Sequence, residues 1–204
     1  MLLTKYTHSC VRLERDDAVL VIDPGTWSEP HALKGADAVL VTHEHTDHID
    51  MLRLAGLGVP VYAPAGAEIA GLEVHRVVRG ETFTAAGFWV TAVGGRHAAV
   101  FEDEPGCANL GYVVEQDVYH PGDALHVPDL PVTTLLVPMQ ASWLKCAEAI
   151  GFVRAVAPRR AVGIHDGQIN ARGRSSINGW LGGAGGHGYR YLDPGQSLDL
   201  NLDA

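Results

Sequence analysis

The chain has 204 residues, of which 47% are hydrophobic, and this is enough to bury one full core. Its 15 Lys and Arg residues against 24 Asp and Glu residues give a net charge of −9 at pH 7. That balance argues against a nucleic-acid partner and against binding to an anionic membrane surface. The oligomeric state is not readable from the sequence.

The cysteine usage and the N-terminal segment bear on the cell compartment. Three scattered cysteines are too few for a disulfide framework or a CxxC zinc site. The first residues, MLLTKYTHSCVRLE, carry no long apolar stretch behind a basic tip, and no run in the chain approaches 18 apolar residues. We expect a cytoplasmic protein without a membrane span.

Short apolar runs broken by Gly, Pro and Asp predict a strand-rich first half. Residues 10–15 and 18–23 flank an acidic turn and predict a hairpin. A strand buried on both faces is expected at 37–42, because this run is almost wholly apolar. A helix is then predicted over 49–58, followed by a strand at 60–64.

The second half repeats this pattern around one long helix. That helix is predicted over 144–156, with Pro158 ending it. The Gly-rich residues 179–188 predict a loop, and their GxGxxG match is rejected because a strand-like run follows where a helix should begin. Strands are predicted at 71–78, 82–95, 109–123, 132–138, 160–167 and 189–202. The whole indicates an α/β or α+β sandwich in a single domain, residues 1–204.

The stretch VTHEHTDHID, residues 41–50, places three histidines, two aspartates and a glutamate directly after a buried strand. His43, His45 and Asp47 follow one another at two-residue spacing, which in an extended chain points the side chains the same way, so that all three can converge on one spot. Asp47 or His48 could occupy the capping turn of the next helix, with Asp50 in its first turn.

Imidazoles and carboxylates are the ligands that a zinc-like ion takes at open sites. Four such groups cannot easily share one ion from a single short loop. We therefore predict two neighbouring ions, with His43 and His45 on one and Asp47 and His48 on the other. A solvated His-rich loop, or histidines that cap a helix, would give a similar stretch.

Three more candidate ligands stand where apolar runs end. His97, Asp123 and His165 each follow such a run, and two of them come after Gly-containing turns. Open α/β architectures gather their sites at the carboxyl ends of strands. Histidines scattered over the surface would not all follow strand ends. The sequence therefore favours a metal site over a solvated His-rich loop or helix-capping histidines.

These residues resemble a known family. The run HEHTDH, residues 43–48, fits the HxHxDH signature of the metallo-β-lactamase superfamily, and His97, Asp123 and His165 follow in that superfamily's order. The segments VIDPG (residues 21–25), YHPGD (119–123) and IHDG (164–167) add to the likeness. The N-terminal segment TKYTHSCVRLE (4–14) looks most like that of the small bacterial metal-dependent hydrolases. The resemblance implies a four-layer αββα sandwich with a dinuclear metal site along one edge.

The resemblance also implies a ligand set and a cofactor. His43, His45 and His97 would hold the first ion, and Asp123 would bridge the two ions. Asp47, His48 and His165 would hold the second ion. Two divalent ions are expected, with zinc first and manganese or iron as alternatives, because His and Asp sites accept several metals.

Hydrolysis follows from two ions about 3.5–4 Å apart, which activate a water molecule and polarise the bond to be cleaved. Asp47, beside that water, is the predicted catalytic residue because it can orient the water or accept its proton. Asp23, His8 and His120 are candidates for support of the ligands or for substrate contact, although each could equally be an ordinary turn, hairpin or strand-end residue. We expect cleavage of an ester, a lactone or amide-like bond, or a phosphoester in a small molecule.

Other functions remain open. Iron-dependent redox chemistry could use the same ligand set, and a non-catalytic metal-binding scaffold is a third possibility. Chemistry with a Ser or Cys nucleophile has little support, because there is no GxSxG and no cysteine stands beside a catalytic-looking histidine. Whether the acidic loop 101–108 covers the site cannot be read from the sequence.

Overall fold

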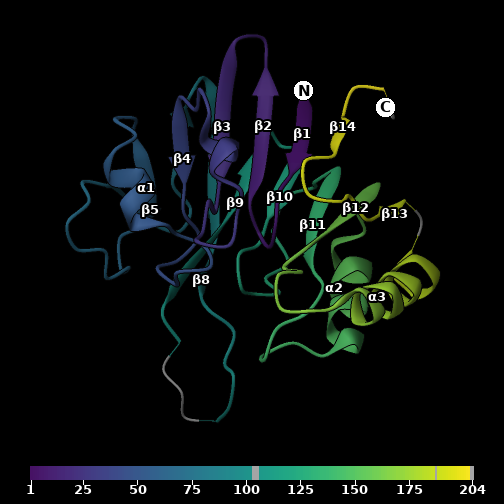
Figure 1. Cartoon of the computed structure of the whole chain (residues 1–204). Coiled ribbons are helices and arrows are strands. Elements are labelled where there is room, and N and C mark those ends of the chain that lie inside the picture. The colour runs from purple at the N-terminus through teal and green to yellow at the C-terminus, as the bar shows by residue number, and fades with distance from the viewer. Residues whose placement is uncertain (103–105, 187, 203–204) are drawn as a thin grey trace.

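The computed structural model describes residues 1–102, 106–186 and 188–202, and within them the strands form two seven-stranded sheets (Figure 1). Sheet A has the order β14 (Ser197–Asp199), β1 (Leu2–Lys5), β2 (Val11–Arg15), β3 (Ala18–Ile22), β4 (Ala38–Leu40), β5 (Val61–Pro64) and β6 (His75–Val77). Sheet B has the order β13 (Tyr189–Arg190), β12 (Arg160–Ile164), β11 (Thr134–Pro138), β10 (Val118–His120), β9 (Ala108–Val114), β8 (Phe88–Arg96) and β7 (Thr82–Ala85).

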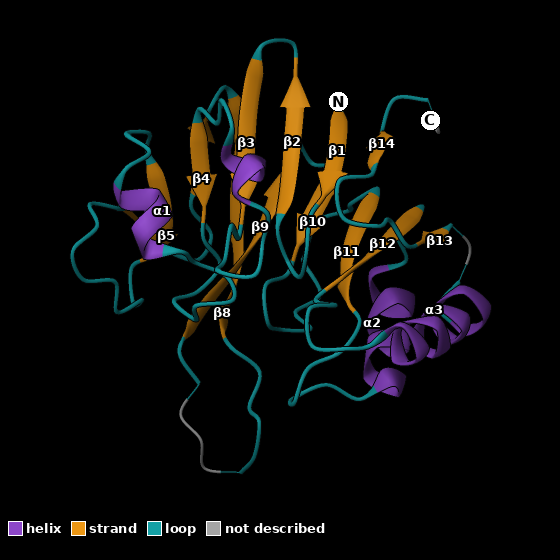
Figure 2. Ribbon diagram, in the orientation of Figure 1, coloured by secondary structure: helices purple, strands orange, loops and turns teal. Residues whose placement is uncertain are grey.

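Helices cover the outer faces of both sheets, which gives the four layers of the expected αββα sandwich (Figure 2). A short 3₁₀ helix, η1 (Pro30–Leu33), and α1 (Met51–Ala55) lie on sheet A. The two longer helices, α2 (Cys146–Val156) and α3 (Ala171–Ala184), lie on sheet B. Among the helices in the described ranges, none is long and apolar enough to cross a membrane.

The alternation of side chains along each strand divides the apolar residues among three cores. In β3, Leu20 and Ile22 point into the core between the sheets, while Val19 and Val21 pack under η1 and α1. This is the period of two that a strand with both faces covered requires. The central core takes residues from both halves of the chain, for example Leu13 and Phe88, both fully buried. The buried strand expected at 37–42 is confirmed as β4, whose three residues are all buried.

Several predicted boundaries shift. Helix α1 begins at Met51 because Asp50 caps it, and the strand expected over 71–78 shortens to the three residues of β6. The stretches predicted as single strands at 82–95 and 109–123 are the hairpins β7–β8 and β9–β10. The C-terminal stretch predicted as strand forms only the short β13 and β14, separated by a turn.

The prediction of a Gly-rich loop over 179–188 is wrong for residues 179–184, because these residues belong to α3, which ends at Ala184. Asn170 caps this helix by accepting hydrogen bonds from two backbone N–H groups, and Leu181 is fully buried against sheet B. Arg154 of α2 donates to the carbonyl of Ala184 at the other end. Capping and packing therefore outweigh the poor helix propensity of glycine.

The strand directions place many loops at one edge of the sandwich. Strands β1, β3 and β4 of sheet A run the same way, and so do β8, β10, β11 and β12 of sheet B. Their carboxyl ends meet at the lower edge of the sandwich in Figure 1. His43, His97, Asp123 and His165 all follow such ends, as the sequence predicted.

Candidate metal centre

The segment after β4 turns sharply instead of staying extended. The backbone N–H groups of His48 and Ile49 both donate to the carbonyl of His45, at 2.9 and 3.0 Å. The two-residue spacing therefore does not bring His43, His45 and Asp47 to one spot, and that expectation is wrong. Because the chain reverses at His45, Asp47 lies with His48 and His165 rather than with His43 and His45.

Helix capping in this segment also differs from the prediction. Asp50, not Asp47 or His48, is the N-cap of α1, and its carboxylate accepts hydrogen bonds from the backbone of Leu52 and Arg53, each at 3.1 Å. Asp47 and His48 are thereby left free to face the carboxyl ends of the strands.

The segment after β3 braces this turn from behind. Thr26 N–H donates to the carbonyl of Thr46 at 2.8 Å, and Asp50 N–H donates to the carbonyl of Pro24 at 3.1 Å. A Cβ on Gly25 would lie 1.8 Å from the carbonyl oxygen of Asp47, so only glycine allows this approach. The VIDPG segment is therefore part of the support of the site.

The possible ligand atoms fall into three overlapping sets, of which His43, His48 and Asp123 form the set that joins the other two. His43, His45 and His97 place one ligand atom each within 4.8 Å of one another, and we name them the first ligand group. Asp47, His48 and His165 do so as well, together with His8, and we name these three the second ligand group. The structure thus brings together every residue that the sequence proposed as a ligand.

Asp123 lies between the two groups. Its Oδ2 is 3.3 Å from His97 Nε2 and 3.1 Å from His165 Nε2, and its Oδ1 is 3.1 Å from His48 Nε2. Asn109 on β9 fixes this turn, because its Oδ1 accepts the N–H of Asp123 at 3.0 Å. Asp123 is only 4% exposed, so its carboxylate contacts the neighbouring imidazoles rather than the solvent.

Four of the histidines present the same nitrogen to the site. His43 Nδ1 donates to Thr42 Oγ1 at 3.0 Å, and His48 Nδ1 donates to Asp23 Oδ2 at 2.6 Å. The Nδ1 atoms of His97 and His165 donate to the backbone carbonyls of Ala98 and Gln140. With the proton fixed on Nδ1, each ring turns its Nε2 lone pair toward the others, which is the arrangement that a metal-binding histidine requires.

Several of these inward-facing atoms are buried without a hydrogen-bond partner, among them the Nε2 atoms of His43, His48 and His97. A buried polar atom left unpaired costs about 1–3 kcal/mol. Lone pairs on nitrogen and carboxylate oxygens at 3.1–3.3 Å from each other need a positive charge between them. The donor set of imidazole nitrogen and carboxylate oxygen therefore fits divalent ions such as zinc.

The shifted pKa values of the buried site residues also indicate that positive charge is favoured between these side chains. Burial works against ionisation of Asp123, but His48 and His165 outweigh it and hold the pKa of Asp123 well below its usual range. Burial also disfavours the charged form of His48, yet the carboxylates of Asp123 and Asp23 raise its pKa well above the ordinary value. Burial and the neighbouring His48 lower the pKa of His43. Protons and metal ions compete for these nitrogens, so a site of this kind binds metal more tightly as the pH rises.

The three supporting candidates occupy different places. Asp23 accepts hydrogen bonds from the N–H and the hydroxyl of Thr42, both at 2.7 Å, and from His48, so it orients two ligand side chains. His8 is fully buried, and its Nε2 lies 3.1 Å from Asp47 Oδ2. His120 is also buried, but its Nε2 donates to the carbonyl of Ser9, and it takes part in the turn rather than in either ligand group.

Sequence reasoning missed other contributors. Trp143 donates its Nε1–H to Asp123 Oδ2 at 3.0 Å. Asp166 accepts the N–H of His8 at 2.9 Å and pairs with the buried Lys5. The adjacency of Asp166 to His165 was a signal that could have pointed to it, whereas nothing in the sequence marks Lys5.

Cys107 lies beside a candidate ligand, which corrects the expectation that no cysteine does so. Its Sγ is 3.8 Å from His45 Nε2. Burial and Glu44 raise the pKa of the Cys107 thiol to about 12, so it is not the thiolate that a cysteine nucleophile requires. Residues 103–105 of the acidic loop lie outside the described residues, and the neighbouring Phe101 is 63% exposed.

Comparison with known sequences gives one family. A model of the family described as Beta-lactamase superfamily domain matches residues 2–165. Protein Rv0786c of Mycobacterium tuberculosis is 40% identical over 187 residues, covering 85% of this chain and 88% of that protein. UPF0173 metal-dependent hydrolase mll0680 of Mesorhizobium japonicum is 29% identical over 151 residues, or 60% of this chain and 63% of that protein.

Comparison with solved structures gives the same fold. Igni18, described as a novel metallo hydrolase from the archaeon Ignicoccus hospitalis, superposes with a TM-score of 0.73. The sequence identity is 18%, and the match covers 97% of each chain. At this identity the likeness shows a shared fold over nearly the whole length of both proteins.

Proposed function

This chain belongs to the metallo-β-lactamase superfamily, and from that premise we propose that it is a metal-dependent hydrolase of a small molecule. The observation that carries the proposal is the set of four histidines whose Nδ1–H groups are fixed and whose Nε2 atoms face the Asp123 carboxylate. The relative from Mesorhizobium japonicum, whose name is metal-dependent hydrolase, supports the reaction type.

The proposed cofactor is a pair of divalent ions, with zinc first and manganese or iron as alternatives. The first ligand group would hold one ion and the second ligand group the other, with Asp123 shared. When bound, such ions polarise a carbonyl or phosphoryl oxygen and lower the pKa of water toward neutrality. The residues of the chain would fix the donor atoms, place a carboxylate that orients the water molecule, and leave one side of the site open.

Asp47 is the residue proposed to orient the water molecule. Although burial opposes it, the hydrogen bond from His8 and the nearby His48 lower the pKa of Asp47 to about 2. The carboxylate is therefore ionised at neutral pH, and its side chain is 19% exposed, so solvent reaches it. These two properties suit a group that orients a water molecule and accepts a hydrogen bond from it.

The open side of the site is marked by His45, which is exposed, and by two tryptophans near its rim. The Trp143 ring lies 6.1 Å from that of His97, and the Trp27 ring lies 4.7 Å from that of His8. Trp27 is 42% exposed. An ester, a lactone or amide-like bond, or a phosphoester with an apolar substituent fits these surroundings, and a small molecule is the proposed partner. The cytoplasmic location expected from the sequence stays a prediction.

The test begins with elemental analysis of the purified protein, isolated without added metal or chelator. Turnover of a panel of ester, lactone and phosphodiester substrates follows, before and after chelation. About two equivalents of zinc or manganese, with hydrolysis that is lost on chelation and restored by the metal, is the expected result. The substitution His45→Ala should abolish turnover, while His75→Ala, at an exposed histidine remote from both groups, should not.

Other results would point elsewhere. Iron as the main metal, with oxidation of substrate in air and no hydrolysis, would replace the proposal with the iron-dependent redox function. Bound metal with no turnover on any of these substrates would leave a metal-binding scaffold as the better description.

A further inference from the structure

His8 stands just after β1 and is held in an unusual backbone conformation. Its φ is 67°, in the left-handed region that a residue with a side chain rarely adopts, and its side chain is fully buried. Strain of this kind costs about 1–3 kcal/mol and persists only where the surroundings impose it. The surroundings of His8 therefore need an explanation.

Three hydrogen bonds from one short segment impose this conformation. The N–H of His165 donates to the carbonyl of His8 at 2.9 Å, and the N–H of His8 donates to Asp166 Oδ1 at 2.9 Å. The N–H of Gly167 donates to His8 Nδ1 at 3.2 Å. The segment that carries the candidate ligand His165 thus also fixes the backbone and the ring of His8.

The contact from Gly167 decides which nitrogen of His8 carries the proton. A backbone N–H can only donate, so His8 Nδ1 is an acceptor and the neutral ring carries its hydrogen on Nε2. That Nε2 lies 3.1 Å from Asp47 Oδ2, and it donates to this oxygen. His8 is therefore the opposite tautomer of His43, His48, His97 and His165, and its Nε2 has no lone pair for a metal.

We propose that His8 is a positioning residue of the second ligand group, and that it acts through Asp47 without binding the ion. Its Nε2–H donates to Oδ2 of Asp47, so Oδ1 is the carboxylate oxygen that this hydrogen bond leaves available to an ion. The inference rests on the metal binding in the proposed function and goes beyond it, because it excludes His8 from the ligand set and gives it a separate task.

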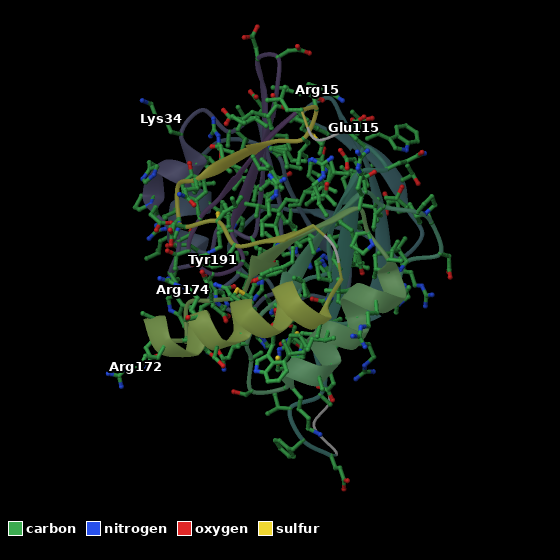
Figure 3. All side chains as sticks on the ribbon, turned by 90° about the vertical axis from the view of Figure 1, so that its right-hand side faces the viewer. Arg15, Lys34, Glu115, Arg172, Arg174 and Tyr191 are labelled. Carbon is green, nitrogen blue, oxygen red and sulfur yellow. The ribbon has the colours of Figure 1, made fainter. Side chains whose placement is uncertain are left out.

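A buried ionic cluster holds this arrangement from behind. Asp166 Oδ2 pairs with Lys5, which is fully buried, and accepts a hydrogen bond from Tyr191 at 2.6 Å. Lys5 and Arg174 lie over the Tyr191 ring at 5.0 and 5.1 Å, and Figure 3 shows Arg174 beside Tyr191 above α3. Because Asp166 is fixed on several sides, the N–H of His8 has a rigid acceptor.

Gly167 is the residue that makes the close approach possible. A Cβ at this position would lie 2.9 Å from Trp27 Cε3 and 3.0 Å from His8 Nδ1. Any side chain here would separate the backbone N–H from the His8 ring or displace Trp27. The IHDG segment therefore supplies a candidate ligand, an acceptor for the His8 backbone, and a donor that selects the His8 tautomer.

Two substitutions of His8 distinguish a purely structural role from a positioning role. Asparagine tolerates the left-handed backbone better than glutamine, so a structural role would make His8→Asn the milder change. Glutamine instead places an amide N–H near the position of Nε2, whereas the asparagine side chain is too short to reach Asp47. A positioning role therefore makes His8→Gln the milder change.

The experiment measures zinc affinity in competition with a chromogenic chelator, using chelator-treated protein that is then titrated with zinc alone. Wild-type protein should take up two equivalents. The variant His8→Asn should bind one equivalent about 10–100-fold more weakly while the other is unchanged, and His8→Gln should stay within about threefold of the wild type. The reverse order, equal weakening in both variants, or a wild-type protein that takes up one equivalent would overturn the proposal.

A second measurement does not depend on whether the variants fold. Nitrogen-15 NMR of the metal-free wild-type protein, with labelled histidine and His8→Gln for assignment where it folds, or sequential assignment where it does not, reports the tautomer of each ring. His8 should carry its hydrogen on Nε2, whereas the neutral ring of His43 should carry its hydrogen on Nδ1. A hydrogen on Nδ1 of His8 would refute the inference. Neither readout involves substrate, so failure of the proposed hydrolysis would be seen separately.

Discussion

The first and second ligand groups use the same kinds of donor atom in different surroundings. In the first group, His45 is exposed and its Nε2 contacts Cys107. In the second group, His48 is fully buried with its Nδ1–H on Asp23, and His165 is 2% exposed. The first group is thus open to solvent on one side, while the second is supported by segments from four strand ends.

This difference in burial indicates different roles for the two ligand groups. The residues that support the second group, such as Asp23, His8 and Asp166, are themselves 0–7% exposed and carry charge or hydrogen bonds. Buried polar networks of this kind are rigid when every member is satisfied. The second group is therefore the more rigidly supported of the two, and His45 makes the first group the more exposed to solvent.

The largest expected effect comes from the carboxylate that both groups share. In Asp123→Asn the negative charge between the imidazoles is lost, and an amide N–H₂ could replace one oxygen. We expect uptake of both ions to weaken by about 100-fold and turnover to fall to background, measured as metal equivalents after dialysis and as rate. The matched control is Asp129→Asn, an exposed aspartate on the same connection, which should change neither. Two tightly held ions in Asp123→Asn would show that the groups are independent.

A pair of histidine substitutions compares the groups directly. In metal-free protein, His48→Ala removes a buried ring bonded to Asp23 and should lower the free energy of unfolding by about 3–5 kcal/mol. His45→Ala removes an exposed ring and should change it by less than about 0.5 kcal/mol. Urea denaturation measures both values, and each variant should lose one of two zinc equivalents. Similar destabilisation by the two changes would contradict the difference in support described above.

The smallest effect is a dependence of stability on pH. Burial lowers the pKa of His8 from 6.5 to about 4. Between these values the unfolded chain binds a proton on this residue and the folded chain does not, so metal-free protein should lose stability as the pH falls from 6.5 toward 4. The full shift corresponds to about 3 kcal/mol at most.

Urea denaturation of the wild type and of His8→Gln across this pH range isolates that contribution. The other histidines are common to both proteins, so only the difference between the two curves belongs to His8. The variant should show the shallower decline. Parallel curves would mean that His8 is protonated alike in the folded and unfolded states.

Much of the fold and of the site could be predicted from the sequence because the signals were local. The apolar runs of β3 and β4 identified strands, and the HEHTDH run identified the family. The Gly-rich end of α3 could not be predicted in the same way. Its helix depends on the Asn170 cap and on burial of Leu181 against sheet B, and propensity alone points to a loop.

The sequence by itself determined which donor atoms this protein has and that they follow strand ends, because residue type and apolar runs are properties of the chain. Only the tertiary structure decided how they are grouped. The turn at His45 separates it from Asp47, and the partners of each ring, from Asp23 to Gly167, select the nitrogen that carries the proton. Hydrogen-bond partners far apart in sequence set tautomer and exposure, so no local pattern could reveal them.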